Sequence, residues 1–418
     1  MKVVWLTNMV PGAVQAHLNQ AAGDGQWVDH VLSGLQTQPE ISLRVLCRGD
    51  SVQSGQISPA LGYCVFAEPK PQIYVPALEE LFRRELQSFQ PDVIHIWGTE
   101  FGHTLAMVNA ARASGMEKRV AVSIQGLCVC VARHYNEGIP QRVVHSYSLR
   151  DFLRQDNLAQ QAKTYARRGV LEVEALQKVH HVIGRTEWDR ACTGQINPEA
   201  VYHTCNETMR VPFYTGTWHY AQCSKHRIFV TNWADPRKGF HYLLEALHLL
   251  LPKYPDAEVY AVGNSYYPGS LKARLRAQAY YNYLARLTDQ YGVKDKIHFT
   301  GYLTAEQMKG EFLRSNVYVL PSTMENSPNT VCEAMLLGVP CVSSAVGGLL
   351  NMMKHGEEGF VYQSTAPYML AYYIDRVFQM GAEAEKMGLA AQAHARKTHD
   401  PDTNLRTLLE IYREVAKE

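Results

Sequence analysis

Two glutamates in the C-terminal half carry the strongest chemical signal of this sequence. Glu325 lies in a polar loop after an apolar run, and Glu333 lies in the helix-like stretch that follows. The segment between them supplies small polar residues and a proline, which are Asn326, Ser327, Pro328, Asn329 and Thr330. These residues can present backbone N–H groups at a helix N-terminus, where the unpaired groups and the helix dipole favour a diphosphate. A carboxylate one turn inside such a helix can accept hydrogen bonds from a ribose diol.

A second group of residues could neutralise negative charge. Arg237, Lys238 and Gly239 stand directly before an amphipathic stretch that begins at Phe240. A lysine beside a helix N-terminus can stabilise a departing diphosphate as a bond to it breaks. The guanidinium of Arg237 can hold phosphate in a bidentate way. The two groups together predict a nucleotide-diphosphate site.

Residues 317–362 resemble the E-x7-E signature of glycosyltransferase family 4. Pro328 with Glu333-Ala334-Met335 matches the P-x4-E-A-M pattern of that family. The resemblance implies that Glu325 lies beside the hydroxyls of the donor sugar and Glu333 beside the nucleotide ribose. The Lys238-Gly239 pair also matches the family, but the usual arginine a few residues upstream is missing. Residues 232–234 are Asn-Trp-Ala there, so Arg237 is the candidate for its role.

Four further glycine-containing turns resemble parts of the same family. The turn at Gly263 and the turn at Gly301-Tyr302 each follow an expected strand, and Gly347-Gly348 follows another. In the N-terminal half, Gly25 lies in a glycine-rich turn, followed by Trp27 and an apolar helix. Glycine there permits close backbone approach to the donor phosphates. The resemblance implies that Gly25, Gly263, Tyr302 and Gly347 line the donor site.

The N-terminal half also contains candidate residues on the acceptor side. Gln125 follows an expected strand, at a point where the family often has a histidine, so a histidine-assisted activation of the acceptor is in doubt there. Arg185 and Glu187 follow the last strand of this half and are expected, with Trp27, to face the acceptor. His95, in a Pro-Asp-Val-Ile-His strand that matches the family, is expected to be structural.

The elements that must position these residues form a repeating pattern. Apolar runs typical of buried strands occur at residues 3–6, 43–47, 93–97, 120–124 and 179–184, and again at 227–231, 258–262, 296–300, 317–320 and 340–343. Helix-like stretches, such as 78–89, 105–113 and 240–251, lie between them. This alternation predicts an α/β fold with parallel sheets covered on both faces.

The length of 418 residues exceeds what one hydrophobic core usually supports, so two domains are expected. We place an N-terminal acceptor-binding domain at 1–205, a linker at 206–226 and a C-terminal sugar-nucleotide-binding domain at 227–398. The resemblance implies the GT-B arrangement, with two Rossmann-like domains whose parallel sheets face a central cleft. It also implies that the last helix, 404–418, packs back on the first domain.

Composition excludes several classes of protein. The net charge of +1 offers no general attraction to nucleic acid, and no recognition motif accompanies it. The nine scattered cysteines form neither a disulfide framework nor a zinc pattern, and the only D-x-D, Asp400 to Asp402, is interpreted as a helix cap. No metal site is therefore expected. The N-terminal apolar run is too short for a signal peptide and no run approaches 20 apolar residues, so a cytoplasmic location is expected.

Residues 133–168 combine seven basic residues with four interleaved aromatic ones. Such a segment suits peripheral contact with the inner face of a membrane that carries a lipid-diphosphate acceptor. A solvated helical hairpin explains the same composition.

The resemblance implies a retaining, metal-independent hexosyltransferase-like enzyme without a cofactor. It would move a sugar from a nucleotide-sugar co-substrate, a UDP-sugar first of all, to a glycan or polyprenyl-diphosphate-linked acceptor in cell-surface polysaccharide biosynthesis. A sugar-nucleotide epimerase and a phosphorylase fit the residues less well. A catalytically degenerate transferase-like protein that acts as a binding or regulatory partner remains an alternative, because of Gln125 and the missing upstream arginine.

Overall fold

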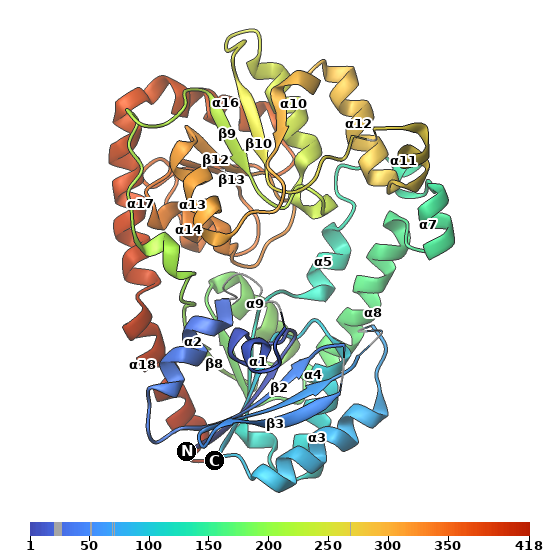
Figure 1. The fold of residues 1–418 in the computed structure, drawn as a ribbon, viewed down its shortest axis with the longest axis vertical. Coiled ribbons are helices and arrows are strands. Elements are labelled where there is room, and N and C mark those ends of the chain that lie inside the picture. Colours follow the sequence, from blue (N-terminus) through green and yellow to red (C-terminus); the bar gives the residue numbers. More distant parts are fainter. Residues whose placement is uncertain (21–26, 51, 69, 71, 268) are drawn as a thin grey trace. The chain divides into compact units, whose positions relative to one another are not determined.

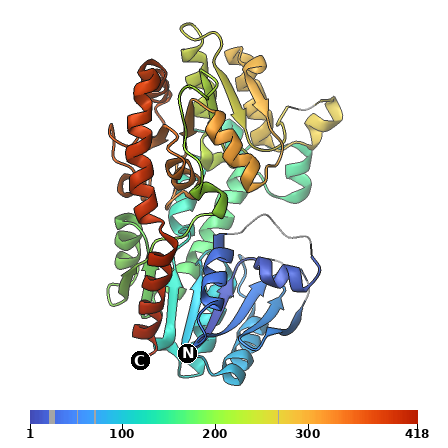
Figure 2. The ribbon, with the colours of Figure 1, turned by 60° about the vertical axis from the view of Figure 1, so that its left-hand side comes forward.

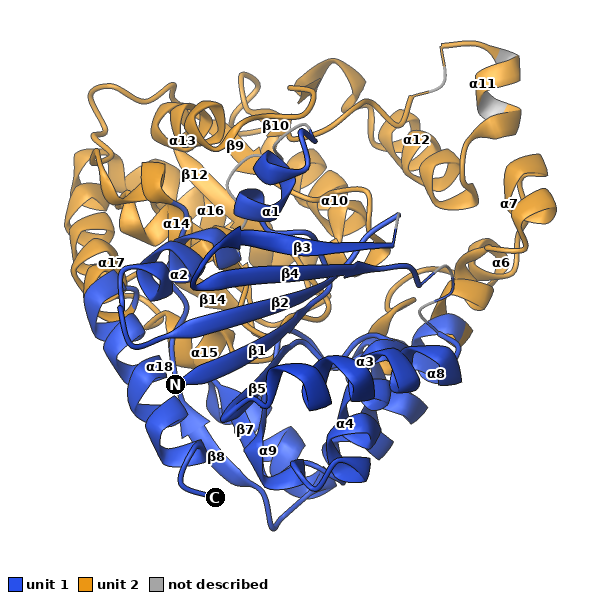
Figure 3. Ribbon diagram, turned by 60° about the horizontal axis from the view of Figure 1, so that its bottom comes forward, with its two compact units in different colours: residues 1–132, 164–210, 399–418 blue, residues 133–163, 211–398 orange. Residues whose placement is uncertain are grey.

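The computed structural model describes residues 1–20, 27–50, 52–68, 70, 72–267 and 269–418, without the side chains of residues 27, 271 and 274. The chain forms two compact units (Figure 3). Unit 1 comprises residues 1–132, 164–210 and 399–418, and unit 2 comprises residues 133–163 and 211–398. One segment differs from the expected domain boundaries, since residues 133–163 group with unit 2. Its hydrogen bonds explain this, because Asp151 accepts from the backbone of Ala279 and the carbonyl of His134 accepts from Thr323.

Unit 1 is built on a sheet with the strand order β3-β4-β2-β1-β5-β6-β7-β8. All neighbours are parallel except β3, which pairs antiparallel with β4 at the edge. The bounds are β1 Lys2–Thr7, β2 Ser42–Arg48, β3 Gln53–Ser58, β4 Leu61–Phe66, β5 Val93–Trp97, β6 Val120–Ser123, β7 His181–Gly184 and β8 Val201–Thr204. The sequence predicted five of these strands and missed β3, β4 and β8.

Helices cover both faces of this sheet because its strands are apolar on both sides. Val4 and Leu6 of β1 join a core with α3 and α4, whereas Val3 and Trp5 join a second core with α2 and α18. The helices are α1 Gly12–His17, α2 Trp27–Gln36, α3 Pro76–Phe89, α4 Gly102–Ala113, α5 Cys128–His134, α8 Leu158–Leu176, α9 Glu187–Ile196 and α18 Pro401–Val415.

The C-terminal helix α18, the red helix that ends at the C-terminus in Figure 2, is an integral part of unit 1 and shares a core with β1. Tyr412 is fully buried, accepts a 2.8 Å hydrogen bond from the Trp5 indole and lies 2.6 Å from His95 Nδ1. Asp400 caps the helix by accepting from Thr403 N at 2.9 Å, which confirms the predicted capping role of the D-x-D turn.

Unit 2 contains a fully parallel sheet with the order β11-β10-β9-β12-β13-β14. The strands are β9 Arg227–Val230, β10 Glu258–Ala261, β11 Ile297–Phe299, β12 Val317–Leu320, β13 Cys341–Ser344 and β14 Phe360–Tyr362, of which the sequence missed only β14. The helices, drawn in Figure 1, are α6 Gln141–Val144, α7 Leu149–Arg154, α10 Phe240–Leu250, α11 Leu271–Arg276, α12 Ala279–Tyr291, α13 Ala305–Arg314, α14 Asn329–Leu336, α15 Leu349–Met352, α16 Pro367–Met380 and α17 Ala384–Thr398.

Candidate functional site

The order of strands in unit 2 creates a topological switch point between β9 and β12. From β9 the chain continues outward to β10 and β11, and from β12 it continues in the opposite direction to β13 and β14. The loops that leave the carboxyl ends of these two strands therefore diverge, and in open α/β sheets this is where ligands bind. The turn with Lys238 follows β9, and the loop with Glu325 follows β12.

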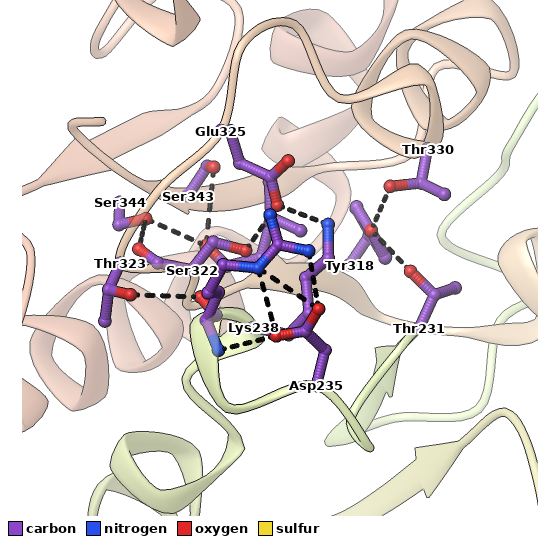
Figure 4. A network of polar contacts seen from close by, with 12 residues as sticks. Thr231, Asp235, Lys238, Tyr318, Ser322, Thr323, Glu325, Thr330, Ser343 and Ser344 are labelled. Carbon is purple, nitrogen blue, oxygen red and sulfur yellow. Dashed lines mark hydrogen bonds and ion pairs between the residues drawn. The ribbon is translucent and has the colours of Figure 1, made fainter. Parts of the chain in front are cut away.

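Lys238 and Glu325 meet directly at this point (Figure 4). The Lys238 ammonium lies 2.6 Å from Oε1 of Glu325, and the Ser322 hydroxyl donates to the same oxygen at 2.7 Å. Both charged side chains are largely buried, at 18% and 10% exposure. An ammonium carries three N–H bonds, so Lys238 can bond an additional oxygen while it remains bonded to Glu325.

The turn and the loop are fastened to each other through their backbones. Thr323 N donates to the carbonyl of Arg237 at 2.7 Å. Gly239 adopts a left-handed conformation with φ at 66°, and a Cβ there would lie 2.9 Å from the carbonyl carbon of Pro321 and closer still to its oxygen. Gly347 is in similarly close contact with the backbone of Glu325 and has φ at 53°. Only glycine allows these approaches, so Gly239 brings the Lys238 turn against the end of β12 and Gly347 lies against the backbone of Glu325.

The Arg237 guanidinium is engaged by a residue that the sequence analysis did not single out. Its Nη2 donates to Oδ2 of Asp235 at 2.6 Å and its Nε lies 3.1 Å from both carboxylate oxygens. Burial alone would raise the pKa of Asp235, but the charge and hydrogen bonds of Arg237 outweigh it and lower the pKa of that carboxyl. The only sequence signal for this pair was an aspartate two residues before an arginine, with a proline between them.

The helix α14 begins at Asn329, after Pro328 in the N-cap position. The hydroxyl of Thr330 accepts from Tyr318 on β12 at 2.7 Å, so it anchors the start of the helix. The buried Oγ of Ser327 has no hydrogen-bond partner among the described residues. Glu333 is 2% exposed on the same helix. Helix N-termini of this kind bind anions.

Two of the predicted turns are paired with each other. Gly263 and Gly301 exchange backbone hydrogen bonds of 2.8 and 3.1 Å, and Tyr302 beside them is 84% exposed. Trp233 lies in the segment, residues 232–234, where the family usually has its upstream arginine. Its ring is buried among aromatic rings, with the centroids of Tyr266 and Phe299 at 5.2 and 5.5 Å. That position therefore belongs to the core.

Unit 1 contains a cavity of about 320 Å³ at the carboxyl ends of β5 to β8, between α2 and α18. Gln125 and Arg185 both line it, and both bond to Glu207, at 2.6 and 2.7 Å. The sequence analysis missed Glu207, which follows β8 and is 6% exposed. Its signal was weak, since it lay in a segment interpreted as a linker.

Of the other two acceptor-side candidates, Glu187 and Trp27, the structure describes only the side chain of Glu187. Glu187 is exposed in the first turn of α9 and is not among the lining residues. The side chain of Trp27 and all of Gly25 lie outside the described residues. His95 is fully buried between Ser123 and Tyr412, and burial lowers its pKa to about 3.

Across the described part of the chain, no helix combines the length and apolar character needed to cross a membrane. The described residues also contain no cluster of three or more histidine, cysteine, aspartate or glutamate side chains suited to a metal ion.

Comparison with known proteins finds a family match in the C-terminal half. Residues 224–394 match the family model for glycosyl transferases group 1. An uncharacterized glycosyltransferase of Methanocaldococcus jannaschii is 30% identical over 141 residues, covering 34% of this chain and 33% of that protein. A D-inositol 3-phosphate glycosyltransferase of Streptomyces griseus is 31% identical over 166 residues, covering 39% of this chain and 34% of that protein. The aligned stretches thus span about a third of the length of these curated relatives.

Solved structures extend the similarity to the whole chain. Sucrose-phosphate synthase from Thermosynechococcus elongatus gives a TM-score of 0.72 at 15% identity, over 99% of both chains. Anabaena HepE, in complex with UDP and glucose, gives 0.67 at 16% identity, over 98% of this chain and 99% of its own. These likenesses show the fold, which is GT-B, and they confirm the predicted α/β fold class.

Proposed function

We propose that this chain, whose residues 224–394 match the family model for glycosyl transferases group 1, transfers a sugar from a nucleotide-sugar donor to a glycan or lipid-linked saccharide. The observation that carries the proposal is the contact between Lys238 and Glu325 at the switch point of unit 2. It joins a cation suited to a leaving phosphate with a carboxylate suited to sugar hydroxyls. UDP-sugars are the first donors to test, because HepE is solved with UDP and with UDP-glucose.

In the proposed reaction the bond between the anomeric carbon and the phosphate oxygen breaks, and an acceptor oxygen bonds to the same face of the sugar. The acceptor proton passes to the leaving phosphate. Lys238 and the N-terminus of α14 stabilise the negative charge that develops there. Because the acceptor attacks the face that the phosphate leaves, we propose that the anomeric configuration is retained. Lys238 and the N-terminus of α14 supply the positive charge that a metal ion supplies elsewhere, so we also propose metal independence.

The remaining donor contacts follow from the chemistry of the site. Glu325 accepts hydrogen bonds from sugar hydroxyls, and Ser322 holds its carboxylate in place. The Ser327 hydroxyl, buried without a partner among the described residues, suits a phosphate oxygen. Glu333 accepts from the ribose, and Gly263, Gly347 and the backbone beside Tyr302 border the nucleotide.

We further propose that the acceptor binds the unit 1 cavity, where Arg185, Glu207 and Gln125 form a polar wall. A cavity with apolar walls and a few convergent polar groups is typical of a site for a small organic ligand. A sugar offers hydroxyls to Glu207 and Gln125, and a lipid diphosphate offers an anion to Arg185. A role in cell-surface polysaccharide assembly, close to the membrane, is consistent with such acceptors.

The proposal is tested by titrating the protein with nucleotides and nucleotide sugars while its thermal stability is followed. A ligand at about 100 times its dissociation constant adds about 2.7 kcal/mol of stability. We expect one nucleotide series to stabilise the protein, and Lys238→Met and Glu333→Gln to weaken its binding at least tenfold. Lys253→Met is the matched control, because Lys253 forms a similar 2.6 Å ion pair with Asp375 outside the site.

A donor identified in this way is then incubated with saccharide acceptors, and the anomeric configuration of the product is read by NMR. Inversion of configuration contradicts the retaining mechanism. A well-folded protein that responds to no nucleotide contradicts the transferase proposal and favours the alternative of a degenerate binding partner. Equal weakening by Lys253→Met contradicts the assignment of the site.

A further inference from the structure

A short stretch of unit 2 exposes an unusual number of large apolar side chains. Tyr147, Leu149, Phe152 and Leu153 are 50%, 53%, 60% and 73% exposed. Leu275 on α11 is 51% exposed, and α11 packs against α7 (Figure 1). A single exposed leucine is ordinary, but a cluster of this kind marks an interaction site.

Specific contacts hold this apolar cluster in a fixed conformation. The Ser148 hydroxyl caps α7 by accepting from Asp151 N at 3.1 Å. The Asp151 carboxylate, 1% exposed, accepts from Ala279 N at 2.7 Å and thereby joins α7 to the start of α12, which follows α11. Arg150 lies 2.8 Å from Asp151 and 3.0 Å from Asp156. The apolar side chains are therefore presented by an ordered helix.

Cations border this cluster. Arg154, Lys272 and Arg276 are exposed, whereas the acidic residues of the stretch, Asp151 and Asp156, are paired with Arg150. The exposed charges that the structure describes on α7 and α11 are thus all positive. We name this set, comprising Tyr147, Leu149, Phe152, Leu153, Leu275, Arg154, Lys272 and Arg276, the α7–α11 surface.

We propose that the α7–α11 surface docks on an anionic lipid bilayer. The apolar side chains enter the boundary between headgroups and acyl chains, and the three cations bond to headgroup phosphates. Long basic side chains suit this position because their stems pack on apolar surface while their charges remain in the polar layer. A protein partner would have to bring acidic groups to match these cations, whereas an anionic bilayer offers an apolar layer and a plane of phosphates together.

The structure reduces the set of residues within 133–168 that could contact a membrane. Tyr135 of that segment is 4% exposed. Arg168 donates to the carbonyl of Glu100 and lies 4.7 Å from the ring of Phe101, so its charge is held against unit 1. Only residues 147–154 combine apolar exposure with positive charge, and α11, which the composition did not indicate, completes the surface.

The inference deepens the proposed function, because docking would bring the enzyme to a lipid-linked acceptor. It is tested without donor or acceptor, by co-sedimentation of the full chain with phosphatidylcholine vesicles that contain or lack about 30% phosphatidylglycerol. We expect binding only to the anionic vesicles, and at least a tenfold loss at about 0.5 M salt, where surface charges are screened.

Two double variants test whether vesicle binding depends on the α7–α11 surface or on exposed apolar side chains in general. Phe152→Ser with Leu153→Ser should lower the partition coefficient at least tenfold, since two exposed apolar side chains leave the interface. Leu249→Ser with Leu389→Ser removes two exposed apolar side chains elsewhere on unit 2, at 48% and 52% exposure against 60% and 73% for Phe152 and Leu153, and should leave binding unchanged. The thermal unfolding transition of each variant shows that it is folded, and the shift of that transition with nucleotide tests the proposed function separately.

Three outcomes overturn the inference. The first is that the protein binds no vesicles. The second is that it binds vesicles with and without phosphatidylglycerol equally well. The third is that both double variants lose vesicle binding to the same extent. Concentration-dependent self-association that only the Phe152/Leu153 variant abolishes, without vesicle binding, assigns the surface to a protein partner instead. Each of these outcomes leaves the nucleotide site untouched.

Discussion

Substitution of Gly239 by alanine tests whether the Lys238 turn and the Glu325 loop must be in close contact. The new Cβ would approach the Pro321 carbonyl to 2.9 Å at carbon and closer at oxygen, whereas real Cβ atoms keep at least 3.0 Å away from backbone. The carbonyl oxygen must therefore move by about 1 Å, and a misplacement of about 1 Å in a site can cost roughly 100-fold in rate. The left-handed conformation adds about 1 kcal/mol of strain for alanine.

Gly292→Ala is the matched control for the strain term. Gly292 has φ at 64°, close to the 66° of Gly239, but no atom would lie within 4 Å of its Cβ. We expect Gly292→Ala to lose about 1 kcal/mol of stability and to keep its activity. Gly239→Ala should lose more stability and about 100-fold in kcat for donor turnover. Equal activity in the two variants, measured where both are folded, would refute the argument that this contact positions Lys238 against Glu325.

Two further predictions concern a hydroxyl and a buried histidine. Ser322→Ala removes the 2.7 Å hydrogen bond to the Glu325 carboxylate and should lower kcat/KM about tenfold, whereas Ser343→Ala, which loses only a 3.4 Å contact to the carbonyl of Leu320, should not. His95 has its pKa lowered to about 3 by burial, so the unfolded chain binds a proton near pH 6.5 that the folded chain does not. Its contribution to stability is therefore present above pH 6.5 and falls by about 2 kcal/mol between pH 7 and 5, as denaturant titrations should show. The non-titrating His95→Gln variant should have a correspondingly flatter profile, and parallel profiles would contradict this reasoning.

Several of the strands that the sequence predicted are continuous apolar runs, whereas β4, Leu61–Phe66, was missed although it is buried along its whole length. The strands β5 and β12 are continuous apolar runs and were predicted at their observed bounds, Val93–Trp97 and Val317–Leu320. The edge strand β3, Gln53–Ser58, is polar and partly exposed, so no apolar run marks it. The three-residue strand β14 is too short to produce a periodic signal. The placement of residues 133–163 depends on contacts such as Asp151 to Ala279, which are far apart in sequence.

In the candidate site, too, the features that could not be predicted depend on contacts between residues far apart in the sequence. The chemistry of Lys238 and Glu325 could be predicted because each lies in a local pattern of strand, turn and helix. Their 2.6 Å contact could not, because 86 residues separate them and only the strand order brings β9 beside β12. Glu207 was missed for a related reason. Nothing local distinguishes it from the surrounding polar residues, and its importance arises from its bonds to Gln125 and Arg185.

The charges at the carboxyl ends of β9 and β12 indicate which residues stabilise the leaving group in the proposed reaction and which hold the site in place. Lys238 and Arg237 bring two positive charges, which Asp235 and Glu325 balance. Arg237 directs its Nε and Nη2 at Asp235, and the lowered pKa of Asp235 keeps that carboxyl ionised, so the two side chains balance each other's charge within the turn. Lys238 has further N–H bonds to offer, and the N-terminus of α14 offers partial positive charge from its backbone. We therefore infer that Lys238 and α14 chiefly stabilise the leaving group, while Arg237 and Asp235 fix the turn that presents Lys238.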